Sequence, residues 1–153
     1  MSDAKPLVLI VMGSASDMPV MKKAAAQLRE LGIESEVVVT SAHRDPDRTA
    51  QIAREAEGRG IKVIIAGAGM AAALPGTMAA YSSLPIIGVP CASGPLNGLD
   101  ALLAISQMPP GVPVACVAIN GAKNAAILAA QIIAVAAPDV KAKLDELRAK
   151  RAG

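Results

Sequence analysis

The one histidine of this chain lies between a strand-like run and a helix start. His43 follows the apolar run 35–39 and precedes Asp45 and Pro46, a typical beginning of a helix. If the run is a parallel strand, His43 lies at its carboxyl end, where open α/β sheets bind ligands. An imidazole exchanges protons near neutral pH, and the adjacent Arg44 can bind a phosphate or carboxylate. The pair predicts proton transfer on an anionic substrate; the alternative is a histidine that only caps the helix.

A second candidate site follows the first apolar run. The segment Gly13-Ser14-Ala15-Ser16-Asp17 supplies a close backbone approach, two hydroxyls and free N–H groups at a helix start, which suits a phosphate. It lacks the Gly-Lys-Ser/Thr ending of a nucleoside triphosphate loop, which disfavours triphosphate hydrolysis. The alternative is a plain helix cap by Ser16, with Asp17 favourable to the helix dipole.

A third candidate is the glycine-containing loop Ala66-Gly67-Ala68-Gly69-Met70-Ala71-Ala72. It matches the Gly-x-Gly-x-x-Ala pattern of dinucleotide-binding loops. That pattern requires an acidic residue about 20 positions further on, at the end of the next strand, to hold the ribose. The next apolar run, 85–89, is followed by Pro90-Cys91-Ala92-Ser93 and no acid. We therefore expect no nicotinamide cofactor, and glycines that let a ligand or helix approach the backbone.

Apolar runs of strand length alternate with helical patterns along the chain. Nearly continuous apolar strands are typical of a parallel sheet that helices cover on both faces. The expected strands are 7–12, 35–39, 63–66, 85–89 and 114–119. The expected helices are 16–32, 46–58, 71–81, 100–105, 123–135 and 139–151. The third helix starts at Leu74 if Pro75 must lie in its first turn. The sequence predicts one α/β domain over residues 1–153, a three-layer αβα flavodoxin-like (Rossmann-like) fold with a parallel five-stranded sheet.

Composition narrows the class of function. The chain has no Trp or Phe, one Tyr and a net charge of +2, so it lacks the stacking platforms and basic patches of nucleic-acid binders. Its apolar stretches are shorter than the ~20 residues that a membrane-spanning helix needs. The first stretch is also shorter than the apolar core of a signal peptide, which has ~7 to 15 residues. Cys91 and Cys116 do not combine with His43 in a metal-ligand spacing. We expect a cytoplasmic protein that binds no nucleic acid, membrane or metal.

Several ordered motifs together resemble one enzyme family. They are Gly13-Ser14-x-Ser16-Asp17, Ser41-Ala42-His43-Arg44-x-Pro46, Ala66-Gly67-Ala68-Gly69, Leu74-Pro75-Gly76, Leu84-Pro85-Ile86-Ile87-Gly88-Val89-Pro90, Leu96-Asn97-Gly98-Leu99-Asp100, Gln107-Met108-Pro109 and Lys123-Asn124-Ala125-Ala126. The set, which spans nearly the whole chain, is similar to the PurE family of 5-(carboxyamino)imidazole ribonucleotide mutases of purine (IMP) biosynthesis. The resemblance implies a flavodoxin-like subunit of a homo-octamer, with active sites at subunit junctions and neither metal nor organic cofactor.

The resemblance also implies a reaction and a set of site residues. A carboxylate would move from the exocyclic nitrogen of aminoimidazole ribonucleotide to a ring carbon through carbon dioxide held in a dry pocket. His43 would carry the proton as general acid and base. The ribose and phosphate would be bound by Ser14, Asp17 and Arg44, with Ser16 and Ser41 nearby. The imidazole and carboxylate would lie against Gly67, Ala68 and Gly69. The expected substrate-binding residues also include Ala73 and Leu74 in the following segment.

One segment departs from the family pattern. The bacterial form usually reads Gly-Gly-Ala-Ala-His-Leu-Pro-Gly, whereas residues 69–76 have Met70 in place of a glycine and Ala73 in place of a second active-site histidine. The leading hypothesis is a mutase that works with His43 alone. The alternatives are a carboxylase that adds free carbon dioxide to aminoimidazole ribonucleotide, and a homologue that binds a ribonucleotide with weakened catalysis.

Overall fold

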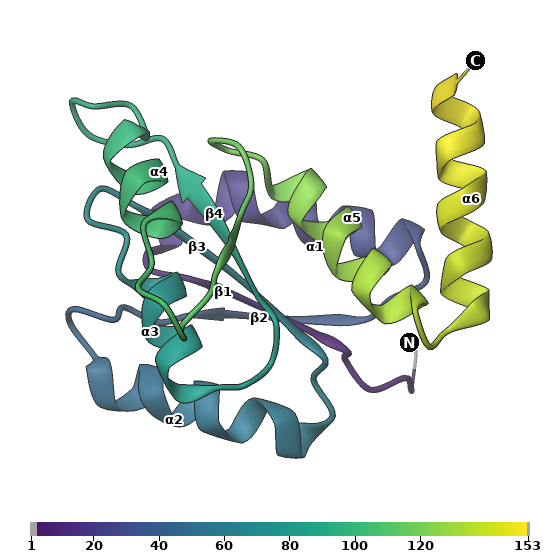
Figure 1. The fold of residues 1–153 in the computed structure, drawn as a ribbon, viewed down its shortest axis with the longest axis horizontal. Coiled ribbons are helices and arrows are strands. Elements are labelled where there is room, and N and C mark those ends of the chain that lie inside the picture. Colours follow the sequence, from purple (N-terminus) through teal and green to yellow (C-terminus); the bar gives the residue numbers. More distant parts are fainter. Residues whose placement is uncertain (1–2, 153) are drawn as a thin grey trace.

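A five-stranded parallel sheet lies between two layers of helices in the computed structural model, which describes residues 3–152 (Figure 1). The strands are β1 (Val8–Met12), β2 (Ser35–Val39), β3 (Val63–Gly69), β4 (Ile86–Cys91) and β5 (Ala115–Cys116). Their order, β2-β1-β3-β4-β5, is that of flavodoxin-like folds, and the predicted fold class is confirmed. Residues 1, 2 and 153 of the expected domain lie outside the described residues.

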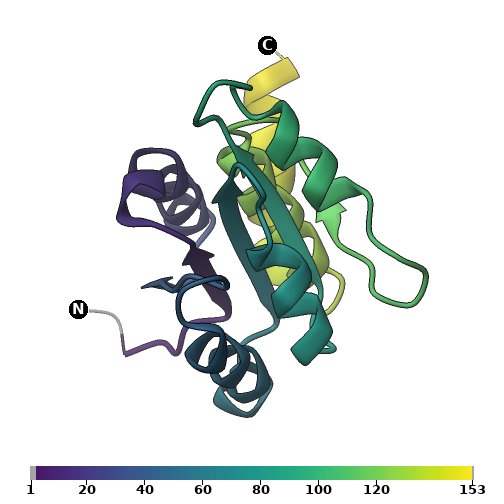
Figure 2. The same ribbon diagram turned by 90° about the vertical axis from the view of Figure 1, so that its left-hand side faces the viewer.

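Helices cover both faces of this sheet (Figures 1 and 2). The 3-10 turn η1 (Ala15–Asp17), α1 (Met18–Glu30) and α5 (Ala122–Ala134) lie on one face, and α6 (Pro138–Ala152) packs against α5. The other face carries α2 (Pro46–Ala56), the 3-10 turn η2 (Glu57–Arg59), α3 (Leu74–Tyr81) and α4 (Leu99–Ser106). Successive side chains of β1 point to opposite faces of the sheet and so enter two hydrophobic cores. Ile10 packs in the core beneath α1 and α5, and Leu9 packs in the core on the other face.

The expectation of strands buried on both faces is right for the central strands and wrong at the edges. All residues of β1 and β4 are buried, whereas Val37 and Val39 of β2 are 39% and 38% exposed. The cause is position: β2 is the edge strand of the sheet and pairs only with β1. At the other edge, β5 is shorter than the expected 114–119, because the chain turns where the Gly121 N–H donates to the Ala118 carbonyl.

α3 begins at Leu74, the start predicted for the case in which Pro75 is confined to the first turn. The preceding Met70 and Ala72 have left-handed backbone (φ 52° and 40°), so the helix does not extend back to Ala71. The apolar helix α5 is covered within the subunit by α1, the sheet and α6. No helix among residues 3–152 is long and apolar enough to cross a membrane.

Candidate active site

A pocket of about 490 Å³ opens at the carboxyl ends of the strands. It lies near the adjacent strands β1 and β3, where the strand order reverses: β1 is followed by β2 on one side, and β3 by β4 on the other. This switch point is the usual ligand site of a doubly wound sheet, and the volume is typical of small-molecule sites. The lining is Gly13, Ser14, Ser16, Asp17, Ser41, Ala42, His43, Arg44, Ala68 to Leu74, and Ser93.

The pocket brings together every residue that the sequence proposed for the site except Gly67. Gly67 is buried below the lining, and a Cβ there would lie 2.3 Å from the Met21 Sδ of α1. Its carbonyl accepts a hydrogen bond from the Gly13 N–H (3.2 Å). Gly67 therefore allows α1 to pack closely on β3, and its carbonyl helps to hold the first loop in place.

Sequence reasoning did not select several lining residues, of which Ser93 is the most informative. Ser93 follows β4 by two positions, and a Cβ on Gly69 would lie only 2.3 Å from its Oγ. The loops after β3 and β4 therefore touch, and a larger residue at position 69 would have to displace the Ser93 side chain. The rule that ligands bind beyond strand ends could have found Ser93 if applied to β4 as well.

The first loop is held by its own hydroxyls. Ser14 Oγ accepts hydrogen bonds from the Ser16 N–H (3.2 Å) and from the Ser16 hydroxyl (2.9 Å), so Ser14 caps η1. The alternative in which Ser16 is the cap is wrong. Asp17 occupies the N-cap position of α1 without making a side-chain capping bond. The Asp17 carboxylate is thus not used by the helix terminus.

Asp17 is a buried acid in the wall of the pocket, 8% exposed. Burial raises the pKa of its carboxyl above the ordinary 3.8, while hydrogen bonds from the Ser14 backbone and the Cys91 thiol act in the opposite direction and lower it. A carboxylate kept in a cleft at a cost in desolvation is typical of functional sites.

Asp17→Asn is therefore expected to stabilise the unliganded protein near neutral pH. Because the folded carboxyl has the higher pKa, its ionisation costs stability as the pH rises from 3.8 through the folded value. The asparagine variant does not ionise, so its advantage in melting temperature should be present at neutral pH and vanish in acid. Thermal unfolding of both proteins across this pH range measures the difference; a variant less stable at neutral pH would contradict the assignment.

The second loop presents His43 and Arg44 on a tight turn. Ser41 Oγ accepts from the Arg44 N–H (3.2 Å), and the Ser41 carbonyl accepts from the Asp45 N–H (2.9 Å). The cap of α2 is Asp45, whose carboxylate accepts from the Arg48 N–H (3.4 Å). The alternative in which the histidine is the cap is wrong, so the His43 imidazole remains available to a ligand.

A buried hydroxyl pair anchors this turn to α2. Thr40 and Thr49 hydroxyls lie 2.8 Å apart, and Thr49 also donates to the Asp45 carbonyl (2.9 Å). Thr49→Val should lower the free energy of unfolding by about 1–3 kcal/mol, because it leaves the buried Thr40 hydroxyl without its partner. Denaturant unfolding measures the loss. The matched control is Thr77→Val, which removes one half-buried bond to the Ala73 carbonyl; an equal loss in both would refute the anchor.

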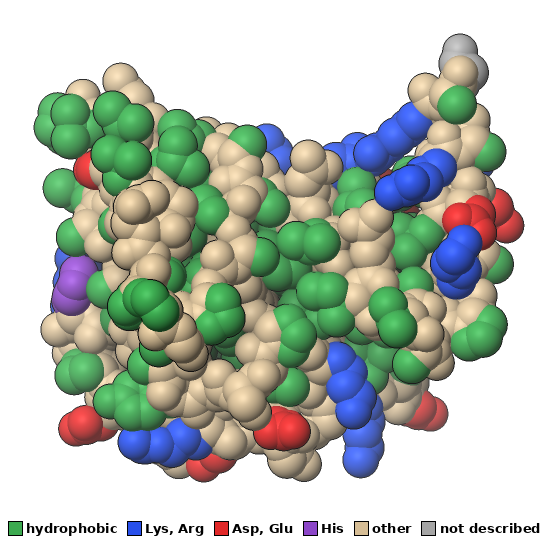
Figure 3. Space-filling model, viewed as in Figure 1, with side chains coloured by type: hydrophobic (Ala, Val, Ile, Leu, Met, Phe, Trp, Pro, Cys, Tyr) green, Lys and Arg blue, Asp and Glu red, His purple; other side chains and the backbone are tan. Residues whose placement is uncertain are grey.

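Charge in the pocket is arranged by depth. The cationic Arg44 and the titratable His43 are exposed at the mouth, whereas the acidic Asp17 is buried in the wall. The histidine is visible as the purple patch at the edge of the molecule (Figure 3). This arrangement suits a ligand with an anionic group for the guanidinium and hydroxyl groups for the carboxylate, with an imidazole at hand for proton transfer.

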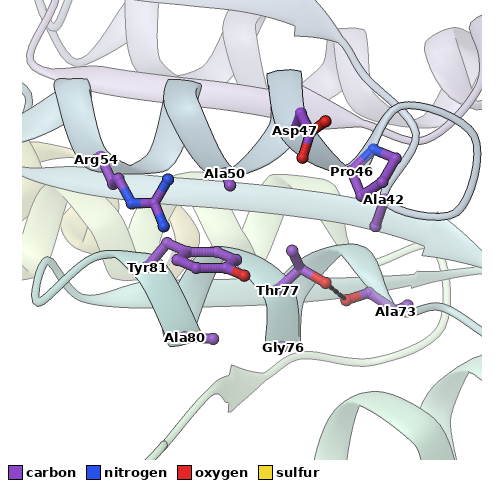
Figure 4. A pocket seen from close by; sticks show the side chains of 10 residues that line it. All are labelled: Ala42, Pro46, Asp47, Ala50, Arg54, Ala73, Gly76, Thr77, Ala80 and Tyr81. Atoms are coloured by element: carbon purple, nitrogen blue, oxygen red, sulfur yellow. Dashed lines mark hydrogen bonds between the residues drawn. The ribbon is translucent and has the colours of Figure 1, made fainter.

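A second cavity of about 530 Å³ lies between α2 and α3 and adjoins the first at Ala42 and Ala73 (Figure 4). The Arg54 guanidinium stacks over the Tyr81 ring, 4.5 Å from its centroid. The small side chain of Ala73 therefore separates two open spaces. Within residues 3–152, no three His, Cys, Asp or Glu side chains are grouped to hold a metal ion.

The fold and the pocket define the class: a flavodoxin-like α/β protein with a ligand site at the carboxyl ends of its strands. Comparison with known sequences identifies the family. The family model described as AIR carboxylase matches residues 7–153, and the chain belongs to this family. An N5-carboxyaminoimidazole ribonucleotide mutase of Pyrococcus horikoshii is 58% identical over 144 residues, which cover 94% of this chain and 81% of that protein.

Two further relatives extend the comparison. A phosphoribosylaminoimidazole carboxylase of Saccharomyces cerevisiae is 50% identical over 147 residues, 96% of this chain and 26% of the yeast protein. The crystal structure of Treponema denticola PurE superposes with a TM-score of 0.88 at 32% identity, covering 96% of this chain and 92% of that one. The predicted family is confirmed.

Proposed function

We propose that the chain is a 5-(carboxyamino)imidazole ribonucleotide mutase of purine biosynthesis, a single αβα domain over residues 1–153. The observation that carries the proposal is the convergence of His43, Arg44 and Asp17 on one pocket at the sheet's switch point. The relatives named as mutases, at 57% and 58% identity, support the same reaction.

In the proposed reaction a carboxylate and a proton exchange places. The N–C bond of the carboxyamino group breaks and releases carbon dioxide, and the exocyclic nitrogen takes a proton from His43. Carbon dioxide then bonds to the ring carbon, and His43 recovers the proton that this carbon loses. Substrate and product are isomers, so the balance needs only a group that gives and takes one proton, as an imidazole does.

The remaining lining residues hold the substrate in this proposal. Arg44 pairs with the phosphate, with Ser14, Ser16 and Ser41 hydroxyls nearby, and Asp17 accepts from the ribose hydroxyls. Ala68 and Gly69 face the imidazole and the migrating carboxylate, since a small residue lets a flat ring approach the backbone. The lining also includes Ala73 and Leu74, which border the same end of the pocket.

The direct test is turnover. Purified protein is incubated with the carboxyamino ribonucleotide, and the absorbance of the carboxylated aminoimidazole product is followed. The proposal predicts product formation well above the uncatalysed rate. Absence of turnover over a range of pH and protein concentration would refute it, and tight calorimetric binding without turnover would then identify a ribonucleotide-binding homologue with weakened catalysis.

A carboxylase is the second candidate, favoured by the alanine at position 73 and by the yeast relative that carries the name carboxylase. A carboxylase would use free carbon dioxide and aminoimidazole ribonucleotide as its substrates. Its rate with aminoimidazole ribonucleotide alone should rise steeply with added bicarbonate. A mutase gains little from ordinary bicarbonate levels, so this titration discriminates the two.

Ala73→His is expected to raise turnover several-fold. Ala73 is half-buried and borders open space on both sides, so an imidazole fits there without displacing core side chains. A second group that hydrogen-bonds the reacting carboxylate adds stabilisation of the kind that preorganised donors supply. The control is Ala73→Leu, which fills the space without a donor and should lower turnover. Equal activity of both variants would contradict this role for position 73.

We also propose a cytoplasmic homo-octamer with no metal or organic cofactor. His43 is exposed in the single chain, and a neighbouring subunit that covers the pocket would supply the dry surroundings that keep carbon dioxide bound. Hydrophobic side chains gather over α4 (Figure 3), where Leu96, Leu99 and Leu103 are 57%, 51% and 53% exposed. Light scattering should give a mass eight times that of the 15.4 kDa chain; a monomer at assay concentration would refute this assembly.

A further inference from the structure

Met70 is a strained residue in the loop that follows β3. Its backbone is left-handed (φ 52°), a conformation that residues with a Cβ adopt at a cost in energy. The turn around it is closed by a hydrogen bond from the Ala72 N–H to the Gly69 carbonyl (3.0 Å). Strain of this kind is concentrated at ligand sites, where the side chain that it positions can contact the ligand.

The Met70 side chain lies at the rim of the pocket and has free apolar surface. The residue belongs to the pocket lining and is 53% exposed. Its side chain rests on the loop after β4, since a Cβ on Gly94 would lie 3.5–3.6 Å from the Met70 Cγ, Sδ and Cε atoms. The thioether is therefore supported by the neighbouring loop, and its exposed surface is available to a ligand.

The other lining residues offer a flat ring no comparable surface. They are small, polar or charged, apart from Leu74, which is only 2% exposed. The chain has no Phe or Trp, and its one tyrosine, Tyr81, lines the second cavity instead. In the described lining, Met70 is thus the large apolar side chain with surface left to bury.

We propose that Met70 is a specificity-determining residue: its thioether packs against the imidazole ring of the bound ribonucleotide. The proposal deepens the proposed function and rests on it for the identity of the ligand. A methionine sulfur about 5 Å from an aromatic ring is attracted to it, and the three rotatable bonds of the side chain let it adapt to the ring. The contact also removes exposed apolar surface from water. It favours a ligand with a flat heteroaromatic base over a sugar phosphate alone.

Met70→Gly should weaken the binding of aminoimidazole ribonucleotide by about 2- to 10-fold, the range of one contact between sulfur and an aromatic ring. Glycine adopts a positive φ without strain, so the melting temperature should stay close to that of the parent. Met70→Leu keeps an apolar side chain without the sulfur, and its Kd should lie between those of the parent and Met70→Gly. The matched control is Met108→Leu, at a half-buried methionine outside the lining, which should keep the parent Kd.

Ribose 5-phosphate, which lacks the ring, is the matched probe. Calorimetry should give the same Kd for this compound in the parent, Met70→Gly and Met70→Leu. An equal weakening of both compounds would overturn the proposal, because it would show a change in the pocket as a whole. Parental binding of the ribonucleotide by Met70→Gly would overturn it as well.

Methyl NMR tests the contact directly. In protein with isotopically labelled methionine methyl groups, the Met70 signal is the one that disappears in Met70→Leu. With aminoimidazole ribonucleotide bound, a nuclear Overhauser effect should link this methyl group to the C–H protons of the imidazole, and the Met108 methyl group should show none. Binding without this effect would overturn the role of Met70 and leave the proposed function standing. A parent protein that does not bind the ribonucleotide at all would refute both.

Discussion

His43→Asn should reduce kcat by about 10²- to 10⁴-fold, the contribution typical of general acid–base catalysis. Asparagine retains polarity and approximate size but cannot take up a proton near neutral pH. The side chain is exposed on a turn whose hydrogen bonds come from Ser41, Arg44 and Asp45, so the substitution leaves the supports of the turn intact. Circular dichroism and calorimetric titration with ribonucleotide should match the parent. Turnover within a few-fold of the parent would refute the proton-transfer role.

A rescue experiment separates proton transfer from a contact role. His43→Ala opens space at the pocket mouth, and imidazole added to the assay can enter it. If His43 acts by exchanging a proton, imidazole should restore part of the turnover, with a pH dependence that follows the added base. A histidine needed only for shape or binding would give no such recovery, and the account of the mechanism would then be wrong.

Arg44→Ala should weaken ribonucleotide binding by about 10- to 100-fold, because hydrogen bonds to charged groups contribute about 1.5–3 kcal/mol. Arg44 is the arginine in the pocket lining and the natural partner of a phosphate. The change should fall mainly on KM, since the phosphate is remote from the bonds that form and break. Initial rates over a wide range of substrate concentration measure the split between KM and kcat.

Arg48→Ala is the matched control for this variant. Arg48 is also exposed and follows Arg44 by four positions, but its guanidinium donates to the Val39 carbonyl (2.9 Å) and does not line the pocket. A general loss of positive charge would affect both variants alike. Arg44→Lys should give an intermediate KM, because lysine keeps the charge without the planar pair of donors. Equal losses in the Arg44 and Arg48 variants would contradict a direct phosphate contact.

The fold was predictable to the extent that local pattern determines burial. β1, β3 and β4 are strands with neighbours on both sides, and their continuous apolar runs identify them. The exposure of Val39 in β2 was not predictable, because it depends on which strand lies at the edge, and strand order is a property of the whole chain. The early end of β5 was likewise not predictable, because the turn after it is also held by a hydrogen bond from the Asn120 N–H to the Pro90 carbonyl of β4 (2.8 Å), a contact between distant segments.

The candidate site was predictable because strand ends converge on one edge of a parallel sheet. Once the runs predicted to end at Met12, Val39 and Ala66 are taken as strands, the residues after them must lie together. The packing role of Gly67 was not predictable, because it depends on the approach of Met21 from α1, a contact between distant segments.

The assigned function is tested most directly by tracing the transferred carboxylate. The purified protein converts the unlabelled carboxyamino ribonucleotide in buffer containing isotopically labelled bicarbonate, and the product is analysed by mass spectrometry at early times. The account predicts a product that carries the substrate's own, unlabelled carboxylate, formed at a rate that falls steeply in His43→Asn. A labelled product, or conversion that survives the loss of His43, would contradict it.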